Sequence, residues 1–170
     1  MTNVAAPLLA GFSIVTVGVV SADGDKFRWP GAVLLCLTSA AFMFVSCLQL
    51  GFHARRHLYS WADITAWWTE DEVHDHLDLL RVEQHADFQL WGRWRRWAHA
   101  AYSAGMVMLW AGVALALVPP VRSTLPAGQL RWAAVAVAAA AAVVEAVWTA
   151  YTPVRHWIRR RQVLAGGAHE

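Results

Sequence analysis

The sequence predicts an all-α membrane protein, with four transmembrane helices in two hairpins joined by a cytoplasmic helical segment. Hydrophobic residues make up 58% of the 170 positions and charged residues 15%, whereas soluble domains average about 45–50% apolar and about 25% charged residues. The apolar residues gather in four blocks, and nearly all charges lie between or after these blocks. This distribution excludes a disordered chain and a soluble enzyme with a single core.

The four apolar blocks are the predicted membrane spans, and they cover residues 5–20, 31–50, 98–118 and 132–151. The last three blocks are long enough to cross a hydrocarbon core of about 30 Å. The first block is shorter, so a signal peptide cleaved after Ala22 is an alternative to a retained helix. We favour the retained helix because no Lys or Arg precedes the block, whereas a signal peptide begins with basic residues.

Basic residues set the predicted orientation. Of the 14 Lys and Arg residues, ten lie between the second and third spans or after the fourth. Loops on the cytoplasmic side of a membrane are enriched in Lys and Arg. We therefore predict a multi-pass protein of the cell membrane with both termini in the cytoplasm. The basic residues on the predicted cytoplasmic side are Arg55, Arg56, Arg81, Arg93, Arg95, Arg96, Arg155, Arg159, Arg160 and Arg161.

Four regions follow from this topology. Residues 1–50 form the first transmembrane hairpin, and residues 51–97 form the cytoplasmic helical segment. Residues 98–151 form the second hairpin, and residues 152–170 form a basic cytoplasmic tail. Arg far outnumbers Lys and Ala is abundant, a composition that we interpret as bacterial.

A long helix is predicted to begin near Glu70 and to run into the third span, because no Pro interrupts the chain before Pro119. Two possible capping boxes, Ser60 with Asp63 and Thr69 with Glu72, precede or begin it. We expect an apolar stripe on this helix to pack on the Trp-rich start of the segment, on another subunit or cytoplasmic partner, or on membrane lipid. The stripe falls within about 80° of arc at 100° per residue and consists of Val73, Leu77, Leu80, Phe88 and Trp91.

Glu145 is the one acidic residue within the four predicted spans. A charge at the centre of a span costs roughly 2.5–3.5 kcal/mol on insertion scales, and no Lys or Arg in the spans offsets it. Three roles remain open: a protonated carboxyl group hydrogen-bonded within the bundle, a group that lines an ion path, and a contact with a partner helix. Its possible hydrogen-bond partners on other spans are Ser46, Gln49, His99, Tyr102 and Ser103.

Four histidines lie at the predicted cytoplasmic ends of three spans: His53, His57, His99 and His156. His53 and His57 are four residues apart and would share one face of a helix, as two metal ligands do. A metal or haem site, a cluster that titrates near neutral pH, and interfacial histidines bonded to water are the alternatives. The identity of any cofactor is left open.

Small residues recur on several spans and favour close helix packing, including packing between copies of the chain. They therefore predict a homo-oligomer. Rows of such residues are Gly11 and Gly18 in the first span, Ala101, Gly105 and Gly112 in the third, and Ala134, Ala138, Ala142 and Ala146 in the fourth.

The sequence holds no nucleophile elbow, phosphate loop or zinc-finger spacing, so we expect no enzymatic activity. The net charge of +2 is too small to indicate nucleic-acid binding.

Three classes of function remain. The first is an ion channel or transport component that uses Glu145, and we favour it. The others are a non-catalytic scaffold that recruits a cytoplasmic protein, and a metal- or haem-binding membrane protein.

Overall fold

The computed structural model describes the backbone of residues 2–58, 63, 66, 70–119 and 125–166, and the side chains of residues 4–58, 63, 66, 72, 74–119 and 129–151. Within these residues all regular structure is helical, and no strand occurs. The elements are α1 (Thr2–Ala22), the 3-10 turn η1 (Gly24–Lys26), α2 (Pro30–Arg56), α4 (Glu70–Asp75), α5 (Leu77–Leu117) and α6 (Leu125–Gly166).

Four of these helices are long and apolar enough to cross a membrane. Each contains an 18-residue window with a mean hydropathy of at least 1.7, and each corresponds to one of the four predicted spans. The number and approximate positions of the apolar helices are therefore confirmed. The candidate spans are Val4–Ala22, Pro30–Arg56, Leu77–Leu117 and Gln129–Tyr151.

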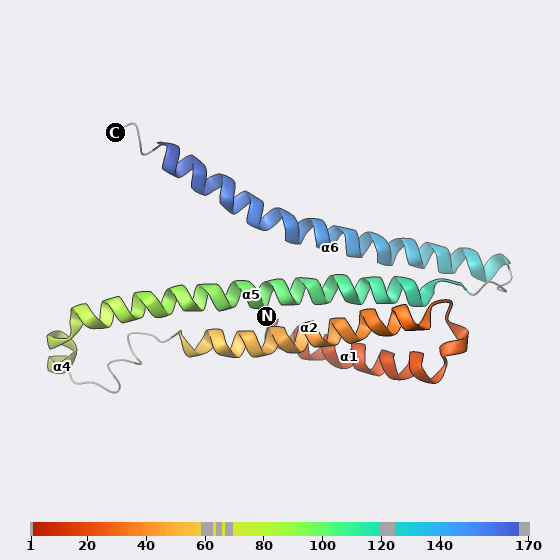
Figure 1. Cartoon of the computed structure of the whole chain (residues 1–170), viewed down its shortest axis with the longest axis horizontal. Helices are drawn as coiled ribbons and strands as arrows, with labels where there is room; N and C mark the ends of the chain where they lie inside the picture. The colour runs from red at the N-terminus through yellow and green to blue at the C-terminus, as the bar shows by residue number, and fades with distance from the viewer. Residues whose placement is uncertain (1, 59–62, 64–65, 67–69, 120–124, 167–170) are drawn as a thin grey trace.

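The helices lie in a row. The principal packing pairs are α1 with α2, α2 with α5, and α5 with α6 (Figure 1). Neighbours in each of these pairs run antiparallel, and α6 diverges from α5 towards its C-terminal end (Figure 1). Because α1 and α6 are the outer members of the row, each has one principal neighbour. Only 6% of the apolar window of α6 is buried within the chain.

The best-packed part of the structure lies between α2 and α5. Phe44 and Leu37 of α2 are fully buried, and two glycines of α5 receive them. A Cβ atom on Gly105 would lie 2.9 Å from the Phe44 ring, and one on Gly112 would lie 3.0 Å from Leu37 Cδ2. Tyr102 adds an edge-on ring contact with Phe44, with centroids 5.9 Å apart. The glycines thus allow close approach of the two helices.

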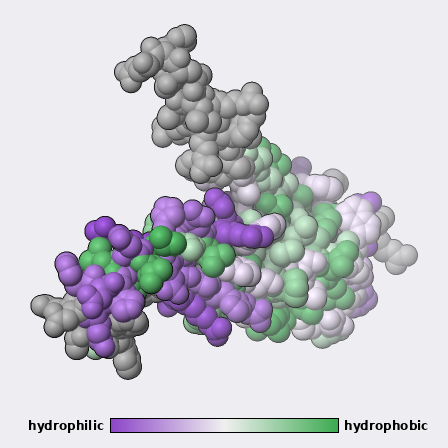
Figure 2. Space-filling model, turned by 60° about the vertical axis from the view of Figure 1, so that its left-hand side comes forward, coloured by the Kyte–Doolittle hydropathy of each residue, from purple (hydrophilic) through white to green (hydrophobic). Residues whose placement is uncertain are grey.

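The predicted long helix is present, but it begins later than expected. α5 runs without interruption over 41 residues, or about 60 Å at the helical rise. This is twice the thickness of a hydrocarbon core of about 30 Å, so about half of α5 extends beyond it. His76 separates α5 from α4, which holds Val73. The surface around this end of the molecule is largely hydrophilic (Figure 2).

Two helices continue past the boundaries that hydropathy predicts. α2 ends at Arg56 and not at Leu50, and α6 runs through Tyr151 to Gly166. Both extensions carry Arg residues, which favour helix as strongly as Leu does but end an apolar window. The proposed capping residues Ser60 and Thr69, and the tryptophans that follow Ser60, lie outside the described residues.

Candidate functional site: an acidic residue in an apolar helix and a polar groove

Glu145 lies on the face of α6 that packs on the rest of the chain. The partly or fully buried positions of α6 recur with helical spacing, and Glu145 belongs to them, together with Ala134, Val135, Ala138, Ala141, Ala142 and Thr149. Ala138 is 3% exposed, and α5 is the principal neighbour of α6. The opposite face of α6 carries exposed apolar side chains, including Val137, Val144 and Trp148. The acidic side chain is therefore directed towards α5 and away from the apolar face.

The polar residues predicted as partners of Glu145 are distributed over two helices. Ser46 and Gln49 of α2 line a groove that is described below. On α5, Tyr102 packs on Phe44, and Ser103 is 2% exposed. The hydrogen bond at Glu145 itself involves the backbone, because the Thr149 hydroxyl donates to the Glu145 carbonyl oxygen at 2.8 Å.

His53 and His57 have separate contacts on α5. The His53 ring stacks on Trp94, with centroids 5.6 Å apart and an interplanar angle of 26°. His57 is the C-cap residue of α2, and its Nδ1 atom lies 3.0 Å from Asp87 Oδ1. Both contacts fasten the end of α2 to the part of α5 that precedes its apolar half. Each of these two histidines thus has its own neighbour on α5, and their use as metal ligands stays a prediction.

The remaining predicted ligands do not complete a metal site in the described part of the chain. His99 is exposed on α5, and the side chain of His156 lies outside the described residues. Among the described side chains, no three His, Cys, Asp or Glu residues come together in a way that would hold a metal ion.

The predicted apolar stripe on the long helix is only partly covered. Leu77, Leu80 and Trp91 are partly buried, but Phe88 is 56% exposed and packs on Trp91 with ring centroids 5.1 Å apart. Gln84 and Asp87 are partly buried instead. The covered face is therefore rotated away from Phe88, because Asp87 turns towards His57. The side chain of Val73 lies outside the described residues.

A second, uncovered apolar stripe follows the other side of this part of α5. Its members fall within about 80° of arc, and each is at least 41% exposed. They are Leu79, Val82, Leu90 and Trp97. Hydropathy alone does not separate this stripe from the predicted one, because leucines and valines occur on both sides of the helix.

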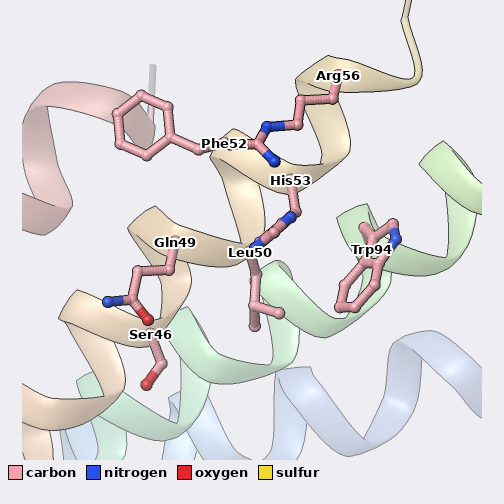
Figure 3. A pocket seen from close by; sticks show the side chains of 7 residues that line it. All are labelled: Ser46, Gln49, Leu50, Phe52, His53, Arg56 and Trp94. Atoms are coloured by element: carbon pink, nitrogen blue, oxygen red, sulfur yellow. The ribbon is translucent and has the colours of Figure 1, made fainter.

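A groove of about 760 Å³ lies near the C-terminal end of α2. Six of its lining residues belong to α2 and one, Trp94, to α5 (Figure 3). Phe52 points away from Trp94, so that aromatic side chains stand on opposite sides of the polar residues (Figure 3). The groove is lined by Ser46, Gln49, Leu50, Phe52, His53, Arg56 and Trp94.

The groove was missed by the sequence analysis, although its signal is present there. Ser46, Gln49, His53 and Arg56 follow one another at spacings of three, four and three residues. This is the period of one helix face, and it continues from a span into its basic flank. Ser46 and Gln49 were predicted as partners of Glu145, and His53 as a metal ligand. Arg56 entered only as one of the basic residues that set the orientation, so the face that the four share was not recognised.

The small residues divide into two groups. Gly105, Gly112 and Ala138 pack within the chain, so contacts inside one copy account for these three, and the homo-oligomer stays a prediction. Gly11 and Gly18 of α1 have no atom of another element within 4 Å of a built Cβ.

Scans against protein families, curated proteins and solved structures find nothing that matches this chain.

Proposed function

We propose that this chain is a multi-pass protein of the cell membrane whose termini and residues 51–97 lie in the cytoplasm. The four apolar helices support the membrane location. The antiparallel pairs α1 with α2 and α5 with α6 suit two transmembrane hairpins (Figure 1). The excess of Arg between α2 and the apolar half of α5, and after the apolar part of α6, supports this orientation.

Within this topology we propose a transport function in which Glu145 attracts cations. The observation that carries the proposal is the position of Glu145 on the small-residue face of α6, directed towards α5. An acidic residue in a span is costly and is typical of an ion or proton path. If Glu145 served to anchor α6 in lipid, we would expect it at an end of the span. Polar side chains that anchor a span lie there, because from that position they reach the membrane surface.

The open row of helices supports a path that is completed between copies of the chain. α6 has one principal neighbour and a small buried fraction, so a single copy encloses α6 on one side only. Association of several copies would cover the sides of α6 that are open in a single copy, and would close off the space between α5 and α6 that Glu145 faces. The outer face of α1, with Gly11 and Gly18 open to close approach, is a surface through which copies would associate.

Potassium efflux from proteoliposomes tests the transport proposal. We expect Glu145→Gln to lower the efflux rate by about tenfold or more, because an uncharged amide no longer concentrates cations in the path. Thr149→Val is the matched control, since it changes the same face one turn away without altering charge, and its efflux rate should equal that of the wild type. An unchanged rate in Glu145→Gln, or no efflux from the wild type, would contradict the proposal.

A scaffold that recruits a cytoplasmic protein is the second candidate. The observation that favours it is the uncovered stripe of Leu79, Val82, Leu90 and Trp97, on a helix that extends beyond the membrane. A photo-crosslinking residue at position 79 or 82 is expected to capture a discrete soluble protein in cells. The same residue at position 35, which is exposed within the apolar part of α2, serves as the control and should not capture that protein.

A further inference from the structure

One exposed face of α2 changes from apolar to polar along its length. Leu35 and Phe42 are 70% and 66% exposed. Four polar residues continue the same face towards the C-terminal end of the helix, all within about 80° of arc: Ser46, Gln49, His53 and Arg56. A face that is apolar throughout would be expected if ordinary acyl chains alone covered it. The polar half is therefore suited to a partner that offers hydrogen bonds.

The groove on this polar half is rich in donors and carries a positive charge. Arg56 contributes five N–H donors, Gln49 contributes an amide NH₂ group, and Ser46 contributes a hydroxyl. No acidic residue lines the groove. Among the described side chains, no carboxylate lies within ion-pair distance of the Arg56 guanidinium. The complementary ligand is an anion with several acceptor oxygens.

The order of the residues along α2 matches the order of groups in a phospholipid. Arg56 and Gln49 are seven residues apart, or about 10 Å, and Ser46 lies about 5 Å further on. Arg56 lies at the rim of the apolar span, where lipid phosphates lie and where the flexible guanidinium reaches them. With Arg56 at the level of the phosphates, Gln49 and Ser46 would lie at the depth of the ester carbonyls, and Phe42 and Leu35 at the depth of the acyl chains.

The sides of the groove limit what fits within it. Trp94, held by its stack on His53, and Phe52 stand on opposite sides of the polar residues (Figure 3). Aromatic rings at this depth are suited to the boundary between headgroups and acyl chains. A volume of about 760 Å³ accommodates a headgroup with its glycerol and the first methylenes, while the remaining chains extend over Phe42 and Leu35.

We propose that this groove is a binding site for an anionic phospholipid, whose phosphate pairs with Arg56 and whose ester carbonyls accept hydrogen bonds from Gln49 and Ser46. The site belongs to the leaflet in which α2 ends. It depends on α2 spanning a membrane and is independent of transport through Glu145.

Native mass spectrometry of the full chain in mild detergent tests this site. The probes are phosphatidylglycerol and phosphatidylcholine with identical acyl chains. We expect one phosphatidylglycerol retained per copy, with phosphatidylcholine binding about tenfold more weakly, because phosphatidylcholine carries the same phosphate but its choline cation repels Arg56 and leaves the lipid without net charge. Arg56→Ala should abolish this preference. Arg55→Ala is the matched control, because Arg55 is also exposed but does not line the groove, and it should keep the preference.

Gln49→Leu provides a second variant that leaves all charges in place. It is expected to weaken retention of both lipids alike, because it removes contacts to ester carbonyls that the two lipids share. Equal retention of both lipids by the wild type, or equal losses in Arg55→Ala and Arg56→Ala, would overturn the proposal. Displacement of phosphatidylglycerol by millimolar inorganic phosphate would also overturn it, because a free phosphate would then be the ligand.

Discussion

Gly105 of α5 lies so close to Phe44 of α2 that a Cβ atom on Gly105 would stand 2.9 Å from Cε1 of the ring and 3.0 Å from Cδ1. Phe44 is fully buried and cannot move its ring without displacing its neighbours. The absence of a side chain at position 105 is therefore a condition for the contact between the two central helices.

Gly105→Ala is expected to destabilise the protein by about 1–3 kcal/mol, the usual cost of overpacking a filled core. Unfolding by denaturant in detergent micelles measures the change. Gly92→Ala is the matched control on the same helix, since no atom lies within 4 Å of a Cβ built there. It should stabilise the protein by about 0.5–1 kcal/mol, because Ala restricts the unfolded chain. Equal effects of the two substitutions would show that α2 and α5 do not pack through Phe44.

The His57–Asp87 contact is expected to couple the end of α2 to the first half of α5. The two side chains are 29% and 28% exposed, so solvent screens the pair in part, and we expect a coupling energy of about 0.5–1 kcal/mol. A double-mutant cycle with His57→Ala and Asp87→Ala measures it. The cycle of His57→Ala with Asp78→Ala should give no coupling, because Asp78 is exposed on α5. Zero coupling in both cycles would argue against the contact.

Association between copies is expected to depend on α1. Gly11→Leu or Gly18→Leu should shift the population towards monomer, because a Leu side chain prevents close approach of two helices. Gly31→Leu places the same bulk on α2 at a position that is also open, and it should leave the distribution unchanged. Mass measurement in mild detergent follows the distribution. A monomeric wild type would remove the basis for a path between copies.

Hydropathy was sufficient to locate the four long helices, because a span requires only a local excess of apolar residues. The continuity of α5 was predictable as well, because it follows from the absence of Pro, which is also a local property of the sequence. Which residues face one another could not be read in this way. Phe44 and Gly105 are 61 residues apart, and nothing in either segment specifies that the one fills the space left by the other.

The candidate sites were predictable to different degrees. Glu145 is conspicuous because it is the lone acidic residue in an apolar block, but its direction towards α5 depends on how α6 packs. Phe88 was assigned to the covered face by periodicity, whereas the His57–Asp87 contact turns a neighbouring face inwards. The groove on α2 could have been found from the spacing of its polar residues, but its boundary at Trp94 requires the packing of α5.

Accessibility of single introduced cysteines in intact cells tests the central claim, that the four apolar helices cross the membrane with residues 51–97 inside. Cys36 and Cys47 are first replaced by Ala, and a membrane-impermeant maleimide is then applied. Cysteines at positions 25 and 129 should be labelled in intact cells, because both positions are exposed at the ends of candidate spans on the predicted outer side. A cysteine at position 75 should be labelled only after lysis. Labelling at position 75 in intact cells would contradict this topology.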